Sequence, residues 1–328
     1  MQRKSSETNF VCLKKAIFVL SALMIFASSC SRTALLDINR VENSSEVQND
    51  SNQTPSINVD GGTRTEVQNL PKAETFEVAV GDDTRRYLLY VPEVARQRAL
   101  PLLVMINGGG GNFYPFPQEK LFYNLAESEG FVVARPISQQ RIGNEGEWQL
   151  NIGTTNRQDI DFMERLIEDI AADFAIDTTH VYATGYSLGS MFTYEIVCHL
   201  STKFAAVASY AGTMPINHRD CADSSAMGIM HIHGTQDPII SYFNSWEWKN
   251  WDSVGIMYDV PGLVEHWRRK FACSGERRDG MRYIYENCED NARVEHFRLE
   301  GVGHEWPDFI DEQQTATVIW RFLEQFSL

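Results

Sequence analysis

Short, continuous apolar runs recur through the middle of the chain, and they constrain its fold more than any other feature. Their sequences are PLLVMIN, FVVARP, HVYATG, AAVASYAG and IMHIHG. A strand that is apolar at successive positions has both faces buried, as in a parallel sheet covered by helices. Helical stretches lie between the runs, and in the clearest, DIDFMERLIEDIAADF, apolar side chains recur on one stripe. The alternation predicts an α/β fold with a doubly wound, mostly parallel sheet.

Further predicted elements flank this alternation. ETFEVAVGDDTRRYLLYVP predicts two strands joined by a GDDT turn, which form an N-terminal antiparallel hairpin. The chain closes with a predicted strand, RVEHFRLEG, and a predicted helix, EQQTATVIWRFLEQF. With 43% hydrophobic residues the chain can build a sizeable core. We therefore expect one α/β domain over residues 73–328.

The first residues of the chain have a different character. Basic residues precede AIFVLSALMIFA, an apolar run that is too short to cross a bilayer and fits a secretory signal peptide. The small residues ASS lead into Cys30, as at the cleavage site of a bacterial lipoprotein. We expect a signal peptide over residues 1–29 and a lipidated Cys30 that anchors the exported protein to a bacterial membrane, facing the periplasm or the cell exterior. The alternative is an ordinary signal peptide followed by an incidental cysteine.

Residues 30–72 are rich in Ser, Asn, Thr, Asp and Glu and show no sustained apolar period. Such a segment cannot bury enough surface to fold, so we expect a flexible tether or a poorly ordered tail. The formal net charge of the chain is −15. That charge argues against a nucleic-acid partner, and membrane contact is expected only through the N-terminal lipid.

TGYSLGS places Ser187 between Gly185 and Gly189, after a predicted strand and before an apolar helix. This is the context of a nucleophile elbow, in which small residues relieve crowding around a strained serine. The helix behind Ser187 also directs free N–H groups and its dipole toward a developing oxyanion. We predict that Ser187 is a nucleophile, and the alternative is an ordinary turn serine.

A serine nucleophile needs a base, and the base needs a carboxylate that orients it. In doubly wound hydrolases these residues follow in the order serine, acid, histidine, each after a strand. HGTQDPII supplies Asp237 and GVGHEWP supplies His304 in that order. For either residue alone an ordinary turn or loop residue would be the favoured interpretation, but together and in this order they predict a triad. Asp252 and Asp259 are the alternative acids.

The predicted triad also needs donors for an oxyanion. One is expected to be the N–H of Leu188, directly after the nucleophile. The second is expected from NGGGGN, where glycines let the backbone approach a substrate, through the N–H of Gly108 or Gly109. The same glycines lack the Lys-Ser/Thr of a P-loop and the spacing of a dinucleotide fingerprint. We therefore expect no cofactor.

Four cysteines lie in the predicted domain, and an even number in an exported chain predicts disulfides. Three connectivities are possible. Proximity along the chain favours two short loops, Cys198 with Cys221 and Cys273 with Cys288. The sequence contains no C-x-x-C and no H-x-x-x-H, so we expect no metal site.

The chain resembles the polyhydroxybutyrate depolymerase-like esterases, which overlap with feruloyl and acetylxylan esterases of the α/β-hydrolase fold. RRYLLYVP, LPLLVMINGGGGN, GYSLGS, HIHGTQDPIISY and GVGHEWP carry the resemblance, which covers about residues 75–326. It implies an α/β-hydrolase fold and a serine esterase that needs no cofactor, with Ser187 as nucleophile, Asp237 as acid and His304 as base. The family usually has His-Gly where this chain has Asn107-Gly108, which changes the oxyanion loop.

Several aromatic residues are candidates for substrate binding. YFNSWEWKNWDSVG, after the acid loop, predicts either an exposed platform that stacks on sugar or feruloyl rings or a lid that buries its own tryptophans. The candidates are Trp148, Tyr186, Trp246, Trp248 and Trp306. The expected substrate is a small-molecule or polysaccharide ester, such as a feruloyl or acetyl ester of a plant polysaccharide. Alternatives are a polyester depolymerase, a general carboxylesterase, a peptidase of the same fold, or a noncatalytic glycan-binding lipoprotein.

Overall fold

The computed structural model of the protein describes residues 73–110, 116–142, 145–153, 157–248 and 254–328. The expected signal peptide over residues 1–29, the lipidated Cys30 and the tether lie outside the described residues. The same is true of Asp252 and of part of the tryptophan-rich loop. Within the described residues no helix is both long and apolar enough to cross a membrane.

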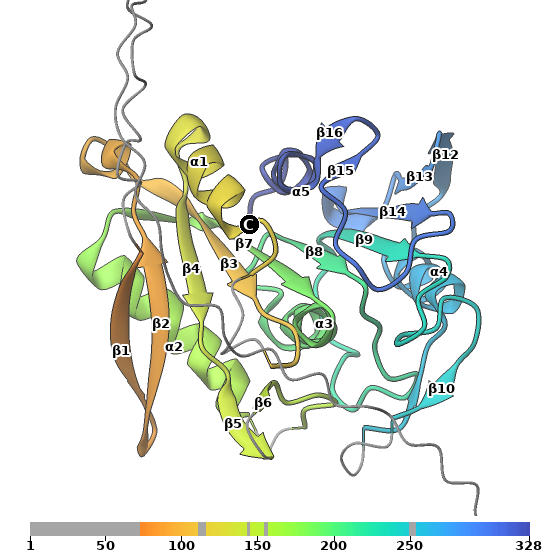
Figure 1. Cartoon of the computed structure of the whole chain (residues 1–328), viewed down its shortest axis with the longest axis horizontal. Helices are drawn as coiled ribbons and strands as arrows, with labels where there is room; N and C mark the ends of the chain where they lie inside the picture. The colour runs from red at the N-terminus through yellow and green to blue at the C-terminus, as the bar shows by residue number, and fades with distance from the viewer. Residues whose placement is uncertain (1–72, 111–115, 143–144, 154–156, 249–253) are drawn as a thin grey trace, which may run out of the picture. The chain divides into compact units, whose positions relative to one another are not determined.

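A ten-stranded sheet forms the centre of the domain (Figure 1). Its order is β1 (Glu74–Val80), β2 (Asp83–Tyr90), β4 (Val132–Pro136), β3 (Leu100–Ile106), β7 (Ile176–Tyr186), β8 (Ala206–Tyr210), β9 (Gly228–Gly234), β14 (Arg293–Leu299), β13 (Arg282–Glu286) and β12 (Gly275–Asp279). The six strands from β4 to β14 are parallel. The strands at both edges are antiparallel, including the β1–β2 hairpin. The predicted doubly wound sheet with an N-terminal hairpin is therefore confirmed.

Helices cover both faces of the sheet (Figure 1). One face packs against α1 (Glu119–Glu129) and α5 (Thr315–Leu323), and the other packs against α2 (Gln158–Asp173), α3 (Leu188–Leu200) and α4 (Val260–Lys270). Strand β3 shows why, because Leu103 and Met105 join the first cluster while Leu102 and Val104 join the second. Successive strand residues point to opposite faces. An unbroken apolar run therefore requires helices on both sides.

The hairpin of β12 and β13 was not predicted. Strand β12 is polar and largely exposed, whereas β13 is half-buried with Ile284 fully buried. Neither strand therefore has the continuous apolar run of the central strands. The signal that the sequence does contain is Asp279-Gly280 at the turn, a pair that favours tight hairpins. Gly280 has a φ of 56°, the left-handed conformation that such turns require.

The remaining elements are short. They are the 3-10 helices η1 (Glu93–Arg96) and η2 (Glu289–Asn291) and the strand pairs β5 (Gln139–Ile142) with β6 (Glu145–Glu147), β10 (Trp246–Glu247) with β11 (Ile256–Met257), and β15 (Phe309–Ile310) with β16 (Gln313–Gln314). They lie in the loops between the longer elements.

Two disulfides join parts of the domain. Cys198 on α3 is bonded to Cys221 in the loop after β8, and Cys273 after α4 is bonded to Cys288 before η2. These are the pairs that proximity along the chain favoured. Each closes a short loop, with sequence separations of 23 and 15 residues, and thereby limits the freedom of the unfolded chain.

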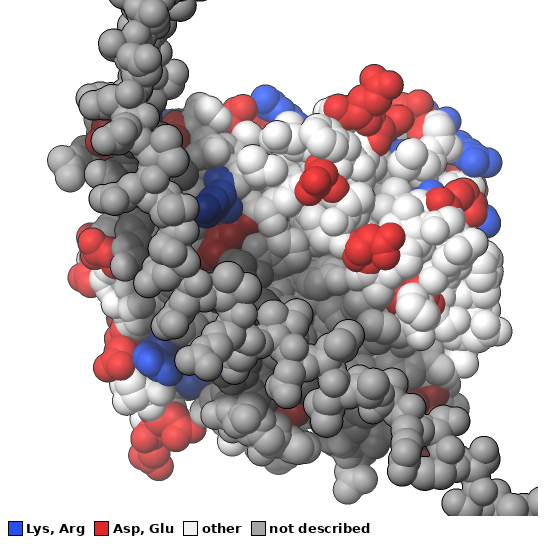
Figure 2. All heavy atoms as spheres, in the orientation of Figure 1, with Lys and Arg blue, Asp and Glu red and all other residues white. Residues whose placement is uncertain are grey.

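Charged side chains of both signs are scattered over the described part of the face drawn in Figure 2, with broad uncharged areas between them. Exposed apolar side chains are present too, among them Ile239 and Phe243, which are 65% and 55% exposed. Both follow Asp237 closely in the sequence. The loop after β9 therefore offers an apolar surface beside the predicted acid.

Candidate active site

Ser187 occupies a sharp turn between β7 and α3. Its φ and ψ are 54° and −119°, in a region that residues other than glycine rarely adopt. The Ser187 N–H donates to the carbonyl oxygen of Tyr210 on β8 at 2.9 Å. The neighbouring strand therefore holds the strained turn in place, with the serine partly exposed.

The glycines two residues on either side of Ser187 let this turn close. A Cβ atom at Gly185 would lie 2.2 Å from the carbonyl oxygen of Gly189. One at Gly189 would lie 2.1 Å from the carbonyl oxygen of Ile106 on β3. Both distances are far below a van der Waals contact. The G-x-S-x-G pattern is therefore a packing requirement of the turn.

The sheet brings the predicted acid and base together. Strands β9 and β14 are parallel neighbours, so the loops that follow them leave the sheet side by side. The N–H of Gln236 in the first loop donates to the carbonyl oxygen of Val302 in the second at 2.9 Å. Asp237 and His304 thereby meet, although 67 residues separate them in the chain.

Ser187, His304 and Asp237 form one hydrogen-bonded series. His304 Nε2 lies 2.9 Å from Ser187 Oγ, and His304 Nδ1 lies 2.6 Å from Asp237 Oδ2. An ionised carboxylate only accepts hydrogen bonds, so the imidazole proton lies on Nδ1 and Nε2 can accept from the serine hydroxyl. This is the arrangement by which a base activates a serine.

Asp237 accepts hydrogen bonds at both carboxylate oxygens. The N–H groups of Ile239 and Ile240 each donate to Oδ1 at 2.8 Å, while Oδ2 faces His304 and also His233 Nε2, at 3.2 Å. Burial by itself raises the pKa of Asp237. The hydrogen bonds from His233, His304 and the Ile240 backbone outweigh burial and hold that pKa well below its usual value. The carboxylate is therefore ionised at neutral pH.

His233 links this carboxylate to the core. Burial raises the pKa of Tyr194, so its hydroxyl stays protonated and donates to His231 Nδ1 at 2.7 Å. His231 Nε2 then donates to His233 Nδ1 at 3.2 Å. His233 in turn donates through Nε2 to the carbonyl oxygen of Ile240 at 3.0 Å and to Asp237. From Tyr194 to Asp237, each side chain thus donates a hydrogen bond to the next one in the series.

Sequence analysis missed this contact of His233 with Asp237. The available signal was the spacing in HIHGTQD, which places a histidine four residues before the acid across a glycine turn. A Cβ atom at Gly234 would lie 2.2 Å from the carbonyl oxygen of Val302. The turn that joins the two side chains therefore depends on glycine.

Two tyrosines hold the loop that carries His304. The hydroxyl of Tyr186 donates to the carbonyl oxygen of His304, and the hydroxyl of Tyr210 donates to that of Glu305 at 2.7 Å. The Trp306 ring lies 4.8 Å from the Tyr210 ring and 5.9 Å from the Tyr186 ring, measured between centroids. Tyr186 and Trp306, which we expected to bind substrate, thus also fix the position of the base.

The predicted oxyanion donors lie around Ser187. Leu188 is the first residue of α3. The backbone of Gly108 packs against the elbow, because a Cβ atom there would lie 3.0 Å from the Tyr186 carbonyl oxygen and 3.1 Å from Ser187 Cβ. Gly109 is one residue farther along, and a Cβ atom there would meet nothing within 4 Å. Of the two glycines, Gly108 is the one whose backbone lies against Ser187.

Trp148, which the sequence suggested as a substrate-binding residue, is buried. Its side chain lies in the core, only 1% exposed, and its ring stacks on Phe192 with centroids 5.0 Å apart. Its Nε1 donates to the carbonyl oxygen of Asn107 at 2.9 Å. Trp148 therefore supports the segment that leads into Gly108 instead of lining a cleft.

Trp246 and Trp248 lie in and next to β10, with ring centroids 5.4 Å apart. Both are partly buried against the core cluster that includes α2, α3 and α4. Residues 249–253 of the same loop lie outside the described residues. Whether the loop is a platform or a lid stays a prediction, as does the contact of these two tryptophans with substrate.

Comparison with known proteins identifies the family. Residues 85–252, about half of the chain, match the family model described as Esterase PHB depolymerase. The chain belongs to this esterase family. The match includes the elbow and the acid loop, while His304 lies beyond it.

Relatives of this family member are esterases by name. It is 27% identical over 239 residues to a bifunctional acetylxylan esterase/xylanase of Neocallimastix patriciarum, covering 70% of this chain and 31% of that protein. It is 23% identical to feruloyl esterase B of Piromyces equi, covering 70% and 43%. The chain thus spans less than half the length of these two relatives. A putative esterase of Nocardia uniformis subsp. tsuyamanensis is 23% identical, covering 74% and 78%.

Solved structures support the fold of this esterase-family protein. An acetyl xylan esterase from Aspergillus awamori superimposes with a TM-score of 0.56 at 16% sequence identity, over 76% of this chain and 99% of that one. An S-formylglutathione hydrolase from Agrobacterium tumefaciens gives a TM-score of 0.51 at 13% identity, over 76% and 91%. At these identities the likeness shows the α/β-hydrolase fold alone.

Proposed function

We propose that this protein is an exported serine esterase that hydrolyses carboxylic esters through an acyl-enzyme. The hydrogen-bonded series from Asp237 through His304 to Ser187 carries the proposal. The strained elbow adds to it, because a strained backbone at a hydroxyl persists only where the surrounding structure enforces it. A noncatalytic glycan-binding protein would have no use for either feature.

In the proposed acylation, Ser187 Oγ forms a bond to the ester carbonyl carbon while its proton passes to His304 Nε2. The carbonyl oxygen becomes an oxyanion, which in this proposal accepts hydrogen bonds from the N–H of Leu188 and from that of Gly108 or Gly109. Asp237 stabilises the imidazolium through Nδ1. As the carbon–oxygen bond to the leaving group breaks, His304 returns the proton to the departing alcohol.

Deacylation repeats these steps with water. His304 Nε2 accepts a proton from the water as its oxygen bonds to the acyl carbon. The tetrahedral intermediate then collapses, the bond to Ser187 Oγ breaks, and the proton returns to the serine. The products are a carboxylic acid and the regenerated enzyme. No redox partner or cofactor enters either half-reaction.

The proposed substrates are feruloyl or acetyl esters of plant polysaccharides. The exposed apolar Ile239 and Phe243 beside the acid loop suit an aromatic or uncharged acyl group, and two of the relatives carry acetylxylan or feruloyl esterase in their names. The alternatives from the sequence, a polyester depolymerase or a peptidase of this fold, would use the same triad. A substrate panel distinguishes them.

We also propose that residues 1–29 direct export, that Cys30 is lipidated and that residues 30–72 tether the domain spanning residues 73–328. The two disulfides support export, because such bonds persist in oxidising compartments. Cys30→Ala is expected to move the protein from the membrane fraction to the soluble fraction. Membrane association that survives this substitution would contradict the lipid anchor.

The purified domain should be assayed against an aryl acetate, methyl ferulate, acetylated xylan, short polyhydroxybutyrate and an acylaminoacyl peptide. Hydrolysis of the first three, and its loss by on the order of 10³-fold or more in Ser187→Ala with an unchanged circular dichroism spectrum, is expected. Full activity of Ser187→Ala would refute the nucleophile. Preference for polyhydroxybutyrate or the peptide would replace the substrate class but keep the mechanism.

A further inference from the structure

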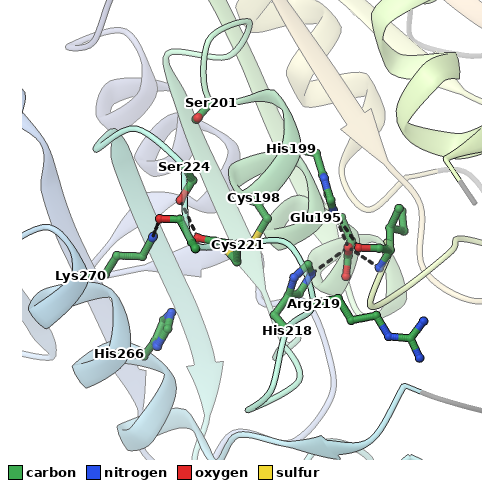
Figure 3. Close-up of a disulfide and its surroundings, with 12 residues drawn as sticks. Glu195, Cys198, His199, Ser201, His218, Arg219, Cys221, Ser224, His266 and Lys270 are labelled. Carbon is green, nitrogen blue, oxygen red and sulfur yellow. Dashed lines mark hydrogen bonds and ion pairs between the residues drawn. A yellow bond between two sulfur atoms is a disulfide. The ribbon is translucent and has the colours of Figure 1, made fainter. Parts of the chain in front are cut away.

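A second buried carboxylate lies in α3, well away from the elbow. Glu195 is eight residues after Ser187, or about 12 Å along a helix. Its side chain is only 1% exposed. His199, one turn farther along α3, and His218, from the loop after β8, both point toward it beside the Cys198–Cys221 disulfide (Figure 3).

The two imidazoles converge on one carboxylate oxygen. His218 Nε2 lies 2.8 Å from Glu195 Oε2, and His199 Nε2 lies 3.7 Å from the same atom. The two histidine side chains are 3% and 5% exposed. The carbonyl oxygen of Ile152 completes the group, 3.1 Å from His199 Nε2. Three side-chain ligand atoms thus lie within 4.8 Å of one another, and a backbone carbonyl oxygen lies beside one of them.

Backbone groups fix the carboxylate in this position. The N–H of Asn151 donates to Glu195 Oε1 at 2.7 Å, and the N–H of Ile152 donates to Oε2 at 3.1 Å. Among the described residues, no lysine or arginine forms an ion pair with Glu195. Buried charges are normally paired with an opposite charge or bound to a metal ion. Glu195 is therefore a buried carboxylate whose ion-pair neighbours among the described residues are the two histidines alone.

The spacing of the ligand atoms suits a small divalent ion. Tetrahedral Zn²⁺ with bonds of about 2.0–2.1 Å to nitrogen and oxygen holds its ligand atoms about 3.4 Å apart. The distances of 2.8 and 3.7 Å from Glu195 Oε2 differ from that value by about 0.6 and 0.3 Å. The ligand atoms of Glu195, His199 and His218 all lie within 4.8 Å of one another.

The surroundings of the cluster bear on ion entry and binding. His218 Nδ1 is buried without a hydrogen-bond partner among the described residues, so when Nε2 binds the ion the N–H on Nδ1 has no acceptor there, which lowers the expected affinity. An open groove of about 710 Å³ borders His218 and Cys221 and offers an entry path. The disulfide anchors the loop of His218 to α3 and so preorganises the site.

We propose that Glu195, His199 and His218 bind one Zn²⁺ ion, with the Ile152 carbonyl oxygen as fourth ligand. The ion joins three chain segments and has a structural role. Sequence analysis expected no metal because H-x-x-x-H is absent. Glu195 and His199 have the same i, i+4 spacing on a helix, which places both side chains on one face.

Zn²⁺ titration of the chelator-stripped mature protein tests the proposal. Calorimetry is expected to show one equivalent bound with a Kd below about 10 µM and a Tm raised by roughly 5 °C at saturating Zn²⁺. The disulfides must stay oxidised, because the sulfurs of Cys198 and Cys221 lie close to His218 and free thiols would bind Zn²⁺ themselves. No binding at 100-fold excess over that Kd would overturn the proposal.

Single substitutions locate the ion. His199→Gln and His218→Gln are each expected to weaken Zn²⁺ binding about 100-fold. His180→Gln is the matched control, because His180 also pairs with a carboxylate, Asp177, but at the surface. Unchanged affinity in His199→Gln and His218→Gln would place the ion elsewhere and refute the site.

X-ray absorption of the wild-type Zn²⁺ complex gives an answer that does not depend on the folding of variants. The expected spectrum has two imidazole nitrogens and oxygen ligands. Sulfur ligands, or fewer than two imidazoles, would contradict the assignment. Ser187→Ala is expected to bind Zn²⁺ like wild type, so this result stands apart from the proposed esterase activity.

Discussion

The domain contains two buried carboxylates that have similar surroundings but differ in the chemistry that their neighbours allow. Each accepts hydrogen bonds from two backbone N–H groups, and each faces two histidines. One group consists of Asp237 with His304 and His233, and the other of Glu195 with His199 and His218. Helix α3 lies between them, since it begins beside the first group and carries the second.

The difference lies in what the far nitrogen of the imidazole meets. His304 Nε2 faces the hydroxyl of Ser187 at a partly exposed turn. His218 Nδ1 is buried with no partner among the described residues. A carboxylate and an imidazole are therefore not enough to build a catalytic group. The imidazole must also reach a nucleophile at a position that a substrate can enter.

The largest expected effect is the loss of activity when the Asp237 carboxylate is replaced. Asp237→Asn should lower kcat by about 10⁴, because an amide nitrogen at this position favours the His304 tautomer that cannot accept from Ser187. Steady-state kinetics measures the loss, and circular dichroism should show that the variant is folded. If most activity survives, another group orients His304. Asp259 is already engaged as the cap of α4, where it accepts from the Gly262 N–H at 2.7 Å.

The matched change at the other carboxylate should affect stability instead. Glu195→Gln puts an amide donor against the N–H groups of Asn151 and Ile152 or against His218. One buried donor then loses its acceptor, which should lower the free energy of unfolding by about 2 kcal/mol. Urea denaturation measures this, while kcat/KM should stay within about threefold of wild type. A loss of activity at unchanged stability would abolish the contrast between the two groups.

A smaller effect is expected at His233, which acts through Asp237 and not on substrate. His233→Leu removes one donor from a charged carboxylate and should lower kcat/KM about tenfold. His233→Gln retains a donor near the position of Nε2 and should restore most of the activity. Equal loss in both variants, with equal loss of stability, would mean that His233 serves packing alone.

Low pH should destabilise the folded protein, because histidines near Asp237 are buried in their neutral form. Burial lowers the pKa of His296 to about 3. The unfolded chain therefore binds more protons than the folded one between about pH 6.5 and pH 3, and the free energy of unfolding falls as the pH drops through this window. His296→Gln should reduce that slope by up to about 1.4 kcal/mol per pH unit, measured by urea unfolding at several pH values. An unchanged slope would mean that other groups carry the acid sensitivity.

The elements that could be predicted are those whose own residues show where they lie in the fold. Continuous apolar strands require cover on both faces, and that requirement alone leads to the observed layers. The loops of Asp237 and His304 followed from their positions after such strands. By contrast, the hairpin of β12 and β13 has no continuous apolar run, and only its Asp279-Gly280 turn gave a signal.

Partners from distant segments were harder to predict. Trp148 reads as a surface aromatic in a polar stretch, yet it fills the core because Phe192 and the Asn107 carbonyl lie beside it. Glu195 is the one acidic residue in the mostly apolar helix α3. Because fully buried glutamates are almost always paired, this position predicts buried partners. One of those partners, His218, comes from the loop after β8, and the residues around it in the sequence do not indicate the contact.

The close packing of the elbow limits how this protein can be engineered. Gly185 and Gly189 have no room for a Cβ atom, and one at Gly212 would lie 2.2 Å from Ser190 Oγ. A mutagenesis library that randomises these codons would consist largely of inactive clones. Diversity aimed at new esters is better placed at Ile239 and Phe243, whose exposed side chains can change without disturbing the backbone that carries the nucleophile.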